Sequence, residues 1–161
     1  MFDPFDMPPP REVRPGEYPV WDEALGLVNR DLAALLPDVG ALRLLALPPW
    51  EPEQSGREQV YVALPDGRWH GDDLLHGRGV TPAAALADVA EAAQDTVMEC
   101  LWQVWPVCAE HRTGMHVREE DGRTVWWCAG GRGARDPAHV RAVVGGLDAL
   151  HRPRRARRRR R

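Results

Sequence analysis

Residues 105–128 read "WPVCAEHRTGMHVREEDGRTVWWC" and hold two of the three cysteines and two of the six histidines of the chain. Cys108 and His111 have the spacing C-x2-H, which lets one tight turn present two metal ligands. A second pair of ligands has to come from an element that folds back toward this turn. The stretch therefore decides both how this part of the chain folds and whether it carries a metal.

The sequence that follows the turn predicts a β-hairpin around "EDG" at 120–122. We expect a three-residue loop, because a type I turn followed by a left-handed glycine is a common hairpin connection. In that register the apolar residues share one face, and His116 and Cys128 lie together on the other. A two-residue loop at 121–122 would place His116 and Cys128 on opposite faces.

The expected ligands form the pattern C-x2-H-x4-H-x11-C, and we predict that they bind one structural Zn²⁺ tetrahedrally. They are Cys108, His111, His116 and Cys128. His139 is the alternative to His116, because it falls in the first turn of a helix expected after Asp136-Pro137. In a third interpretation the cysteines are small buried apolar residues and the histidines lie on a solvated hairpin.

The stretch resembles a zinc-ribbon-like module, in which a knuckle and a β-hairpin hold one structural zinc. The resemblance covers residues 105–129 and differs from the usual four-cysteine pattern, because His116 and Cys128 come from two strands. A helix followed by W-P-x-C-x-x-H and then W-x-C also resembles small actinobacterial proteins of unassigned function. The resemblance implies a structural metal site and no particular activity.

A catalytic zinc would need three protein ligands, an open position and a nearby general base. Glu110 is the residue that would serve as the base of a zinc-dependent hydrolase. The H-E-x-x-H and deaminase patterns are absent. With four ligands available, we expect a closed site and a protein that is not an enzyme.

Charge is distributed unevenly along the chain. All 21 basic residues are arginine, which is typical of the high-GC genomes of actinobacteria. The last ten residues, "RPRRARRRRR", hold eight of them, so residues 1–151 carry a formal charge of −11. We expect residues 151–161 to be a disordered arginine-rich tail. Arg154, Arg155 and Arg157 then suggest nucleic-acid binding, or contact with the acidic body of the protein.

Composition also indicates the cellular compartment. Three cysteines are too few for a disulfide framework and indicate a reducing cytoplasm. The N-terminal stretch lacks the apolar segment of a signal peptide, and no apolar run is long enough to span a membrane. We therefore expect a cytoplasmic protein without membrane contact.

Hydrophobic periodicity predicts an α+β fold with four segments. Residues 1–20 form a proline-rich extended arm, and 21–76 a helix with a three-stranded region. Residues 80–150 form a long helix, the zinc-binding hairpin and a short C-terminal helix. This segment either shares one core with residues 21–76 or has a core of its own. The tail follows.

The individual helices and strands are predicted from local sequence signals. Leu25, Val28 and Leu32 recur at helical spacing after Trp21. "ALRLLAL" at 41–47 predicts a strand, and residues 58–71 a hairpin that turns at Asp66-Gly67. Thr81 and Pro82 are a cap and a first-turn proline for the long helix, which we expect to reach Val104. Asp136-Pro137 would begin the last helix, to about Leu150.

Four tryptophans surround the expected metal site: Trp102, Trp105, Trp126 and Trp127. Trp127 is predicted to lie in the core. In one interpretation the tryptophans pack the hairpin onto the long helix. In the other, one or two are exposed and contact a partner, and Trp126, on the ligand face, and Trp105 are the candidates. Together these features predict a zinc-stabilised adaptor or accessory protein that binds an unknown protein, with a nucleic-acid-associated protein as the alternative.

Overall fold

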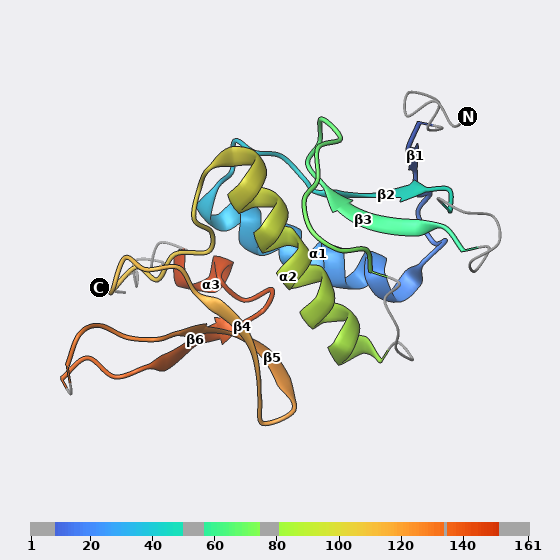
Figure 1. The fold of residues 1–161 in the computed structure, drawn as a ribbon. Helices are drawn as coiled ribbons and strands as arrows, with labels where there is room; N and C mark the ends of the chain where they lie inside the picture. Colours follow the sequence, from blue (N-terminus) through green and yellow to red (C-terminus); the bar gives the residue numbers. More distant parts are fainter. Residues whose placement is uncertain (1–8, 50–56, 75–80, 134, 152–161) are drawn as a thin grey trace, which may run out of the picture.

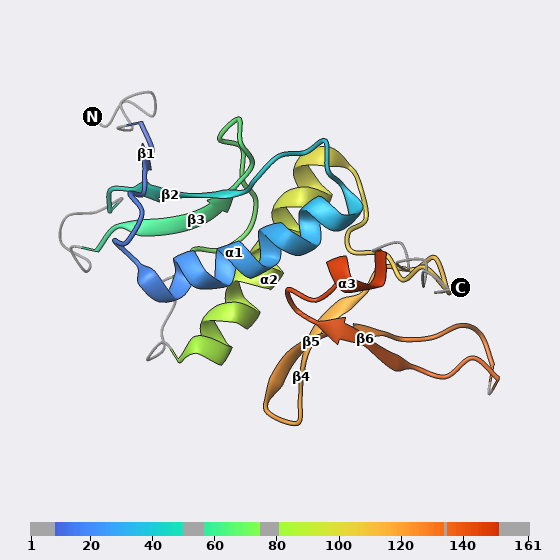
Figure 2. The ribbon, with the colours of Figure 1, turned by 180° about the vertical axis from the view of Figure 1, so that it is seen from behind.

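The computed structural model describes residues 9–49, 57–74, 81–133 and 135–151. Helices α1 (Pro19–Leu35) and α2 (Pro82–Leu101) pack against each other and lie between two antiparallel three-stranded sheets (Figures 1 and 2). The short helix α3 (Asp148–His151) contacts α1. The predicted α+β class is confirmed.

Helix α1 buries one apolar face, as its spacing predicts. Trp21, Leu25, Val28 and Leu32 are all buried, and Pro19 stands at the first helical position, where its missing N–H costs no hydrogen bond. The amide of Leu36 donates the last hydrogen bond of the helix to the carbonyl of Leu32 at 2.7 Å, and Leu36 itself leaves the helical conformation before Pro37.

Helix α2 begins at the predicted cap, where the Thr81 hydroxyl accepts a hydrogen bond from the amide of Ala84 at 3.2 Å. Its buried face is made of small residues and valines, so α1 and the two sheets approach it closely. The helix ends at Leu101, short of the predicted Val104, because Trp102 adopts a left-handed conformation with φ 52°.

The first sheet has the order β1-β2-β3 and consists of β1 (Arg11–Glu12), β2 (Arg43–Leu47) and β3 (Gln59–Ala63). The strand predicted in 41–47 is confirmed. The hairpin predicted in 58–71 is wrong, because the chain after Asp66-Gly67 forms no strand and β3 pairs with β2. The third strand comes from the proline-rich stretch, where Arg11 pairs with Ala46.

The second sheet has the order β4-β5-β6 and consists of β4 (His116–Glu120), β5 (Arg123–Cys128) and β6 (His139–Val143). The helix predicted from Asp136 to Leu150 is wrong, since its first part is strand β6 and only α3 is helical. β6 is rich in the β-branched residues that suit a strand, and it pairs with the free edge of β5.

The β4–β5 turn also differs from the prediction. Glu120 pairs with Arg123, so the loop has two residues, and Asp121 and Gly122 have φ 50° and 74°. Positive φ at both positions defines the type I′ turn, whose twist matches that of the strands. The three-residue loop was therefore wrong, and His116 pairs with Trp127.

Asp31 of α1 joins the helices to the second sheet. Its fully buried carboxylate accepts hydrogen bonds from Trp126 Nε1 and the amide of Gly145, both at 2.6 Å, and from the amide of Leu147 at 2.9 Å. Burial raises the pKa of Asp31, while these three bonds act in the opposite direction. The buried residues of both halves form one continuous core.

Candidate metal centre

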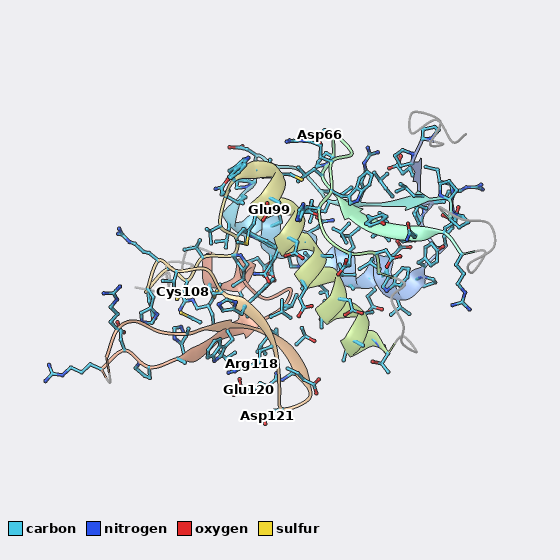
Figure 3. All side chains as sticks on the ribbon, viewed as in Figure 1. Asp66, Glu99, Cys108, Arg118, Glu120 and Asp121 are labelled. Carbon is cyan, nitrogen blue, oxygen red and sulfur yellow. The ribbon has the colours of Figure 1, made fainter. Side chains whose placement is uncertain are left out.

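Four side chains that could hold a metal ion meet at the end of the second sheet. They are Cys108, His111, Cys128 and His139, and one ligand atom from each lies within 4.8 Å of all the others. Both cysteines are buried and both histidines are half-buried. Cys108 lies where the chain arriving from α2 meets the sheet (Figure 3).

A tight knuckle presents the first two ligands. The amide of Arg112 donates to the carbonyl of Cys108 at 2.8 Å, and the amide of Cys108 donates to the carbonyl of Thr113 at 2.9 Å. Arg112 has φ 54°, which turns the chain sharply after His111. The knuckle therefore folds the imidazole of His111 back over the thiol of Cys108.

The other two ligands are neighbours across two strands. Cys128 is the last residue of β5 and His139 the first of β6, and the two are paired in the sheet. Directly paired residues of an antiparallel ladder point to the same face. Here that face is turned toward the knuckle.

The distances between the ligand atoms suit one tetrahedral ion. Cys108 Sγ lies 3.6 Å from His111 Nδ1 and 3.7 Å from His139 Nε2, and Cys128 Sγ lies 3.4 Å from His111 Nδ1. Ordinary zinc–sulfur and zinc–nitrogen bonds at tetrahedral angles place sulfur and nitrogen about 3.6 Å apart. All three of these sulfur–nitrogen distances are within about 0.2 Å of that value.

Asp136 holds His111 in the orientation that a metal requires. Its Oδ1 lies 2.6 Å from His111 Nε2. Because an ionised carboxylate only accepts hydrogen bonds, Nε2 carries the proton and Nδ1 presents its lone pair toward the two thiols. The contact with Asp136, and next that with Cys108, raises the pKa of His111.

Glycines bring Asp136 to this position. The amide of Gly131 donates to the carbonyl of Asp136 at 3.0 Å, and a Cβ on Gly131 would collide with the Asp136 carboxylate. A Cβ on Gly130 would likewise collide with the backbone of Asp136 and Pro137. The amide of Gly130 also donates to Cys128 Sγ at 3.4 Å, which stabilises a thiolate.

His116, the expected fourth ligand, lies outside the cluster, and the alternative His139 occupies that place. His116 pairs with Trp127 on β5, one residue out of phase with Cys128, so it points to the outer face of the sheet and is exposed. There Arg118 stacks over the Trp127 ring at 4.0 Å. The error follows directly from the two-residue turn.

The tryptophan predictions also need correction. Trp126 is fully buried and Trp105 is 1% exposed, and their rings meet edge to face with centroids 5.5 Å apart. Trp126 shares the core face with Cys128 because they are two residues apart on β5. Trp127 is half-buried on the outer face. Trp102, another of the four tryptophans expected around the metal site, is 91% exposed.

Two further expectations concern charged residues. Glu110 is exposed, and its carboxylate lies 3.4 Å from Arg141 Nη1 and 4.0 Å from His139 Nε2. Arg154, Arg155 and Arg157 lie outside the described residues. The third cysteine, Cys100, is half-buried on α2 and is not one of the four clustered residues, and all three thiols are free.

Comparison of the chain with protein-family models, with curated proteins and with solved structures found no match. Among the helices of the described residues, none has both the length and the apolar character needed to cross a membrane. Any function must therefore be inferred from the geometry of the Cys/His cluster and from the exposed surface.

Proposed function

We propose that Cys108, His111, Cys128 and His139 bind one structural zinc ion and that the protein is a non-enzymatic adaptor or accessory protein. Sulfur–nitrogen distances of 3.4–3.7 Å carry the metal proposal. Two thiolates and two imidazoles in a tetrahedron are the ligand set that zinc prefers.

The order of the ligands along the chain supports a structural role. They come from a knuckle, the end of β5 and the start of β6, so one ion would join the knuckle to two paired strands of the sheet. Since the unfolded chain offers no preformed site, the free energy of metal binding stabilises the folded state.

Closed coordination also argues against hydrolysis. Four protein ligands fill a tetrahedral zinc and leave no position for water, and Glu110 is already paired with Arg141. Thiolate ligands favour a reducing compartment such as the cytoplasm. An accessory role through protein contact is supported by the exposed Trp102, because a large apolar side chain in water is typical of an interface.

Nucleic-acid binding is the second candidate, and three arginines near the metal centre favour it. Arg112, Arg132 and Arg135 are exposed, and within the described part of the chain they form no ion pair. Binding through them would weaken steeply with salt. Replacement of these three arginines by glutamine should then lower the affinity for DNA or RNA, and unchanged affinity would exclude this surface.

Elemental analysis of purified protein tests the metal site. We expect one zinc per chain in the wild type, and loss of that zinc in Cys128→Ser and His139→Ala. His116→Ala is the matched control, because it removes an imidazole from the opposite face of the same sheet and should keep the zinc. Zinc-free protein purified without chelator, or zinc lost only with His116, would contradict the proposal.

A further inference from the structure

Helix α2 has an outer face that turns away from the core. Its four acidic residues are exposed and recur at helical spacing: Asp88, Glu91, Asp95 and Glu99. Met98 and Trp102 continue this face at the C-terminal end of the helix, where Figure 3 labels Glu99. We call these six residues the α2 outer face. Among the described residues, no helix or strand packs over it.

Trp102 is the most unusual residue of this face. It is 91% exposed, and its backbone has φ 52°, a left-handed conformation that residues other than glycine rarely adopt. Met98, one turn earlier on the same side, is 40% exposed. The left-handed conformation ends α2, whereas core packing does not explain the exposure, so this end of the face offers an apolar anchor.

The negative charge beside this apolar anchor favours a cationic ligand. α2 contains no basic residue, and the preceding loop brings Asp72 and Asp73 to a hollow of about 210 Å³ shared with Asp88, Glu91 and Asp95. Partial desolvation of the carboxylate by neighbouring atoms, and then repulsion by Asp88 and Asp95, raise the pKa of Glu91, although much of its side chain remains exposed. A cationic ligand would relieve this repulsion.

We propose that the α2 outer face docks the arginine-rich segment 152–161 of the same chain. Residues 1–104 hold the whole net negative charge of residues 1–151, formally −11, and the segment carries eight arginines. The guanidinium group suits this face in two ways, because it pairs with carboxylates through two parallel hydrogen bonds and stacks on tryptophan. The inference does not depend on the metal.

The length of the segment agrees with this placement. The last described residue is His151 of α3, and Figures 1 and 2 place α3 toward the end of α2 that precedes Trp102. Ten extended residues span up to about 33 Å, and a helix of 20 residues such as α2 is about 30 Å long. Because the segment is tethered, its effective concentration at the face is in the millimolar range.

Docking would regulate the arginines themselves. Bound to α2, they are withheld from phosphate groups, and only a strongly anionic partner can compete for them. The acidic face then acts as an internal competitor that suppresses weak, non-specific contacts of the segment.

The indole resonances of the full-length chain test the docking. The Trp102 signal in a ¹H–¹⁵N spectrum is assigned with Trp102→Phe. The wild type is compared with a full-length variant in which the eight arginines of 152–161 are glutamine. We expect the Trp102 signal to differ between the two proteins at about 0.01 M salt and to coincide at about 1 M. The other indole signals should not change.

Matched charge variants test the surface. Asp95→Asn with Glu99→Gln should shift Trp102 toward its position in the arginine-free variant. Glu119→Gln with Glu120→Gln, which removes the same charge from exposed β4, should not. Trp102→Ala should weaken docking about two- to fivefold. The measure is the salt concentration at which the amide signals of 152–161 reach the positions of the undocked segment.

Three results would overturn the proposal. The first is that the Trp102 signals of the wild type and the arginine-free variant coincide at low salt. The second is that the Asp95/Glu99 and the Glu119/Glu120 double variants change the Trp102 signal equally. The third is that the change in the Trp102 signal grows with protein concentration while the molecular mass doubles. The last result would assign the face to the segment of a second copy.

Discussion

The two halves of the molecule, residues 9–104 and residues 105–151, are each stabilised by different interactions. Residues 9–104 contain two long helices whose apolar faces pack against each other and against the first sheet. Residues 105–151 contain three short strands, a knuckle and one helical turn, and their buried apolar residues include Trp105, Trp126 and two cysteines. Long elements bury enough apolar surface to pack by themselves, whereas the short strands are also joined to α1 through Asp31 and bring together four side chains that could hold a metal ion.

Metal removal should have the largest effect and should separate the halves. Zinc binding of this kind contributes on the order of 10 kcal/mol. We expect a chelator to raise amide hydrogen exchange throughout β4, β5 and β6 while the amides of α2 stay protected. Equal loss of protection in both halves would mean that the second sheet is needed to fold the first.

Replacement of Asp31 should remove the hydrogen bonds that link α1 to the second half of the molecule. Asp31→Ala leaves the indole of Trp126 and two backbone amides buried without an acceptor, which should lower the free energy of unfolding by about 3–5 kcal/mol. Chemical denaturation measures this loss, and the exposed Asp38→Ala should change stability by less than about 0.5 kcal/mol.

The same residue predicts a pH dependence. Because burial raises the pKa of Asp31, the folded state binds its proton more tightly than the unfolded state does. The contribution of Asp31 to the free energy of unfolding should therefore fall as pH rises from the ordinary aspartate pKa through the raised one. Denaturation curves of Asp31→Asn should lack this component, and an unchanged slope would refute it.

Asp136 tests the metal-bearing half alone. Asp136→Ala removes the acceptor that fixes the His111 tautomer and should lower zinc affinity 10- to 100-fold, roughly 1.4–2.8 kcal/mol, in chelator competition. Asp136→Asn keeps an acceptor and should recover part of the affinity. Gly131→Ala should resemble Asp136→Ala, because the added Cβ displaces the carboxylate. Zinc affinity that is the same in all three variants would contradict this role.

The smallest expected effect lies in the helical half. Thr81→Ala removes the cap of α2 and should lower the free energy of unfolding by about 1 kcal/mol. Thr81→Ser keeps the hydroxyl and serves as the control. Zinc affinity should be the same in both, since the cap lies at the far end of α2 from Trp102 and the knuckle.

Sequence reasoning succeeded where one element determines its own structure. The α1 and α2 periodicities, the Thr81 cap, strand 41–47 and the C-x2-H knuckle all depend on residues a few positions apart. It failed for β6 and for the second arm of the hairpin at Asp66-Gly67, because a strand there depends on whether a distant edge is free. The exposure of Trp102 was not predicted, because the end of a helix leaves no periodic signal.

By itself, the sequence determined that a Cys/His cluster would form around residues 105–128, and it supplied three of the four ligands and both choices for the fourth. Tertiary structure decided between those choices. The type I′ turn at Asp121-Gly122 sends His116 to the outer face, and pairing of β6 with β5 places His139 opposite Cys128. A one-residue change of register moves a strand residue to the opposite face of the sheet, so only the assembled ladder determines which imidazole meets the two thiols.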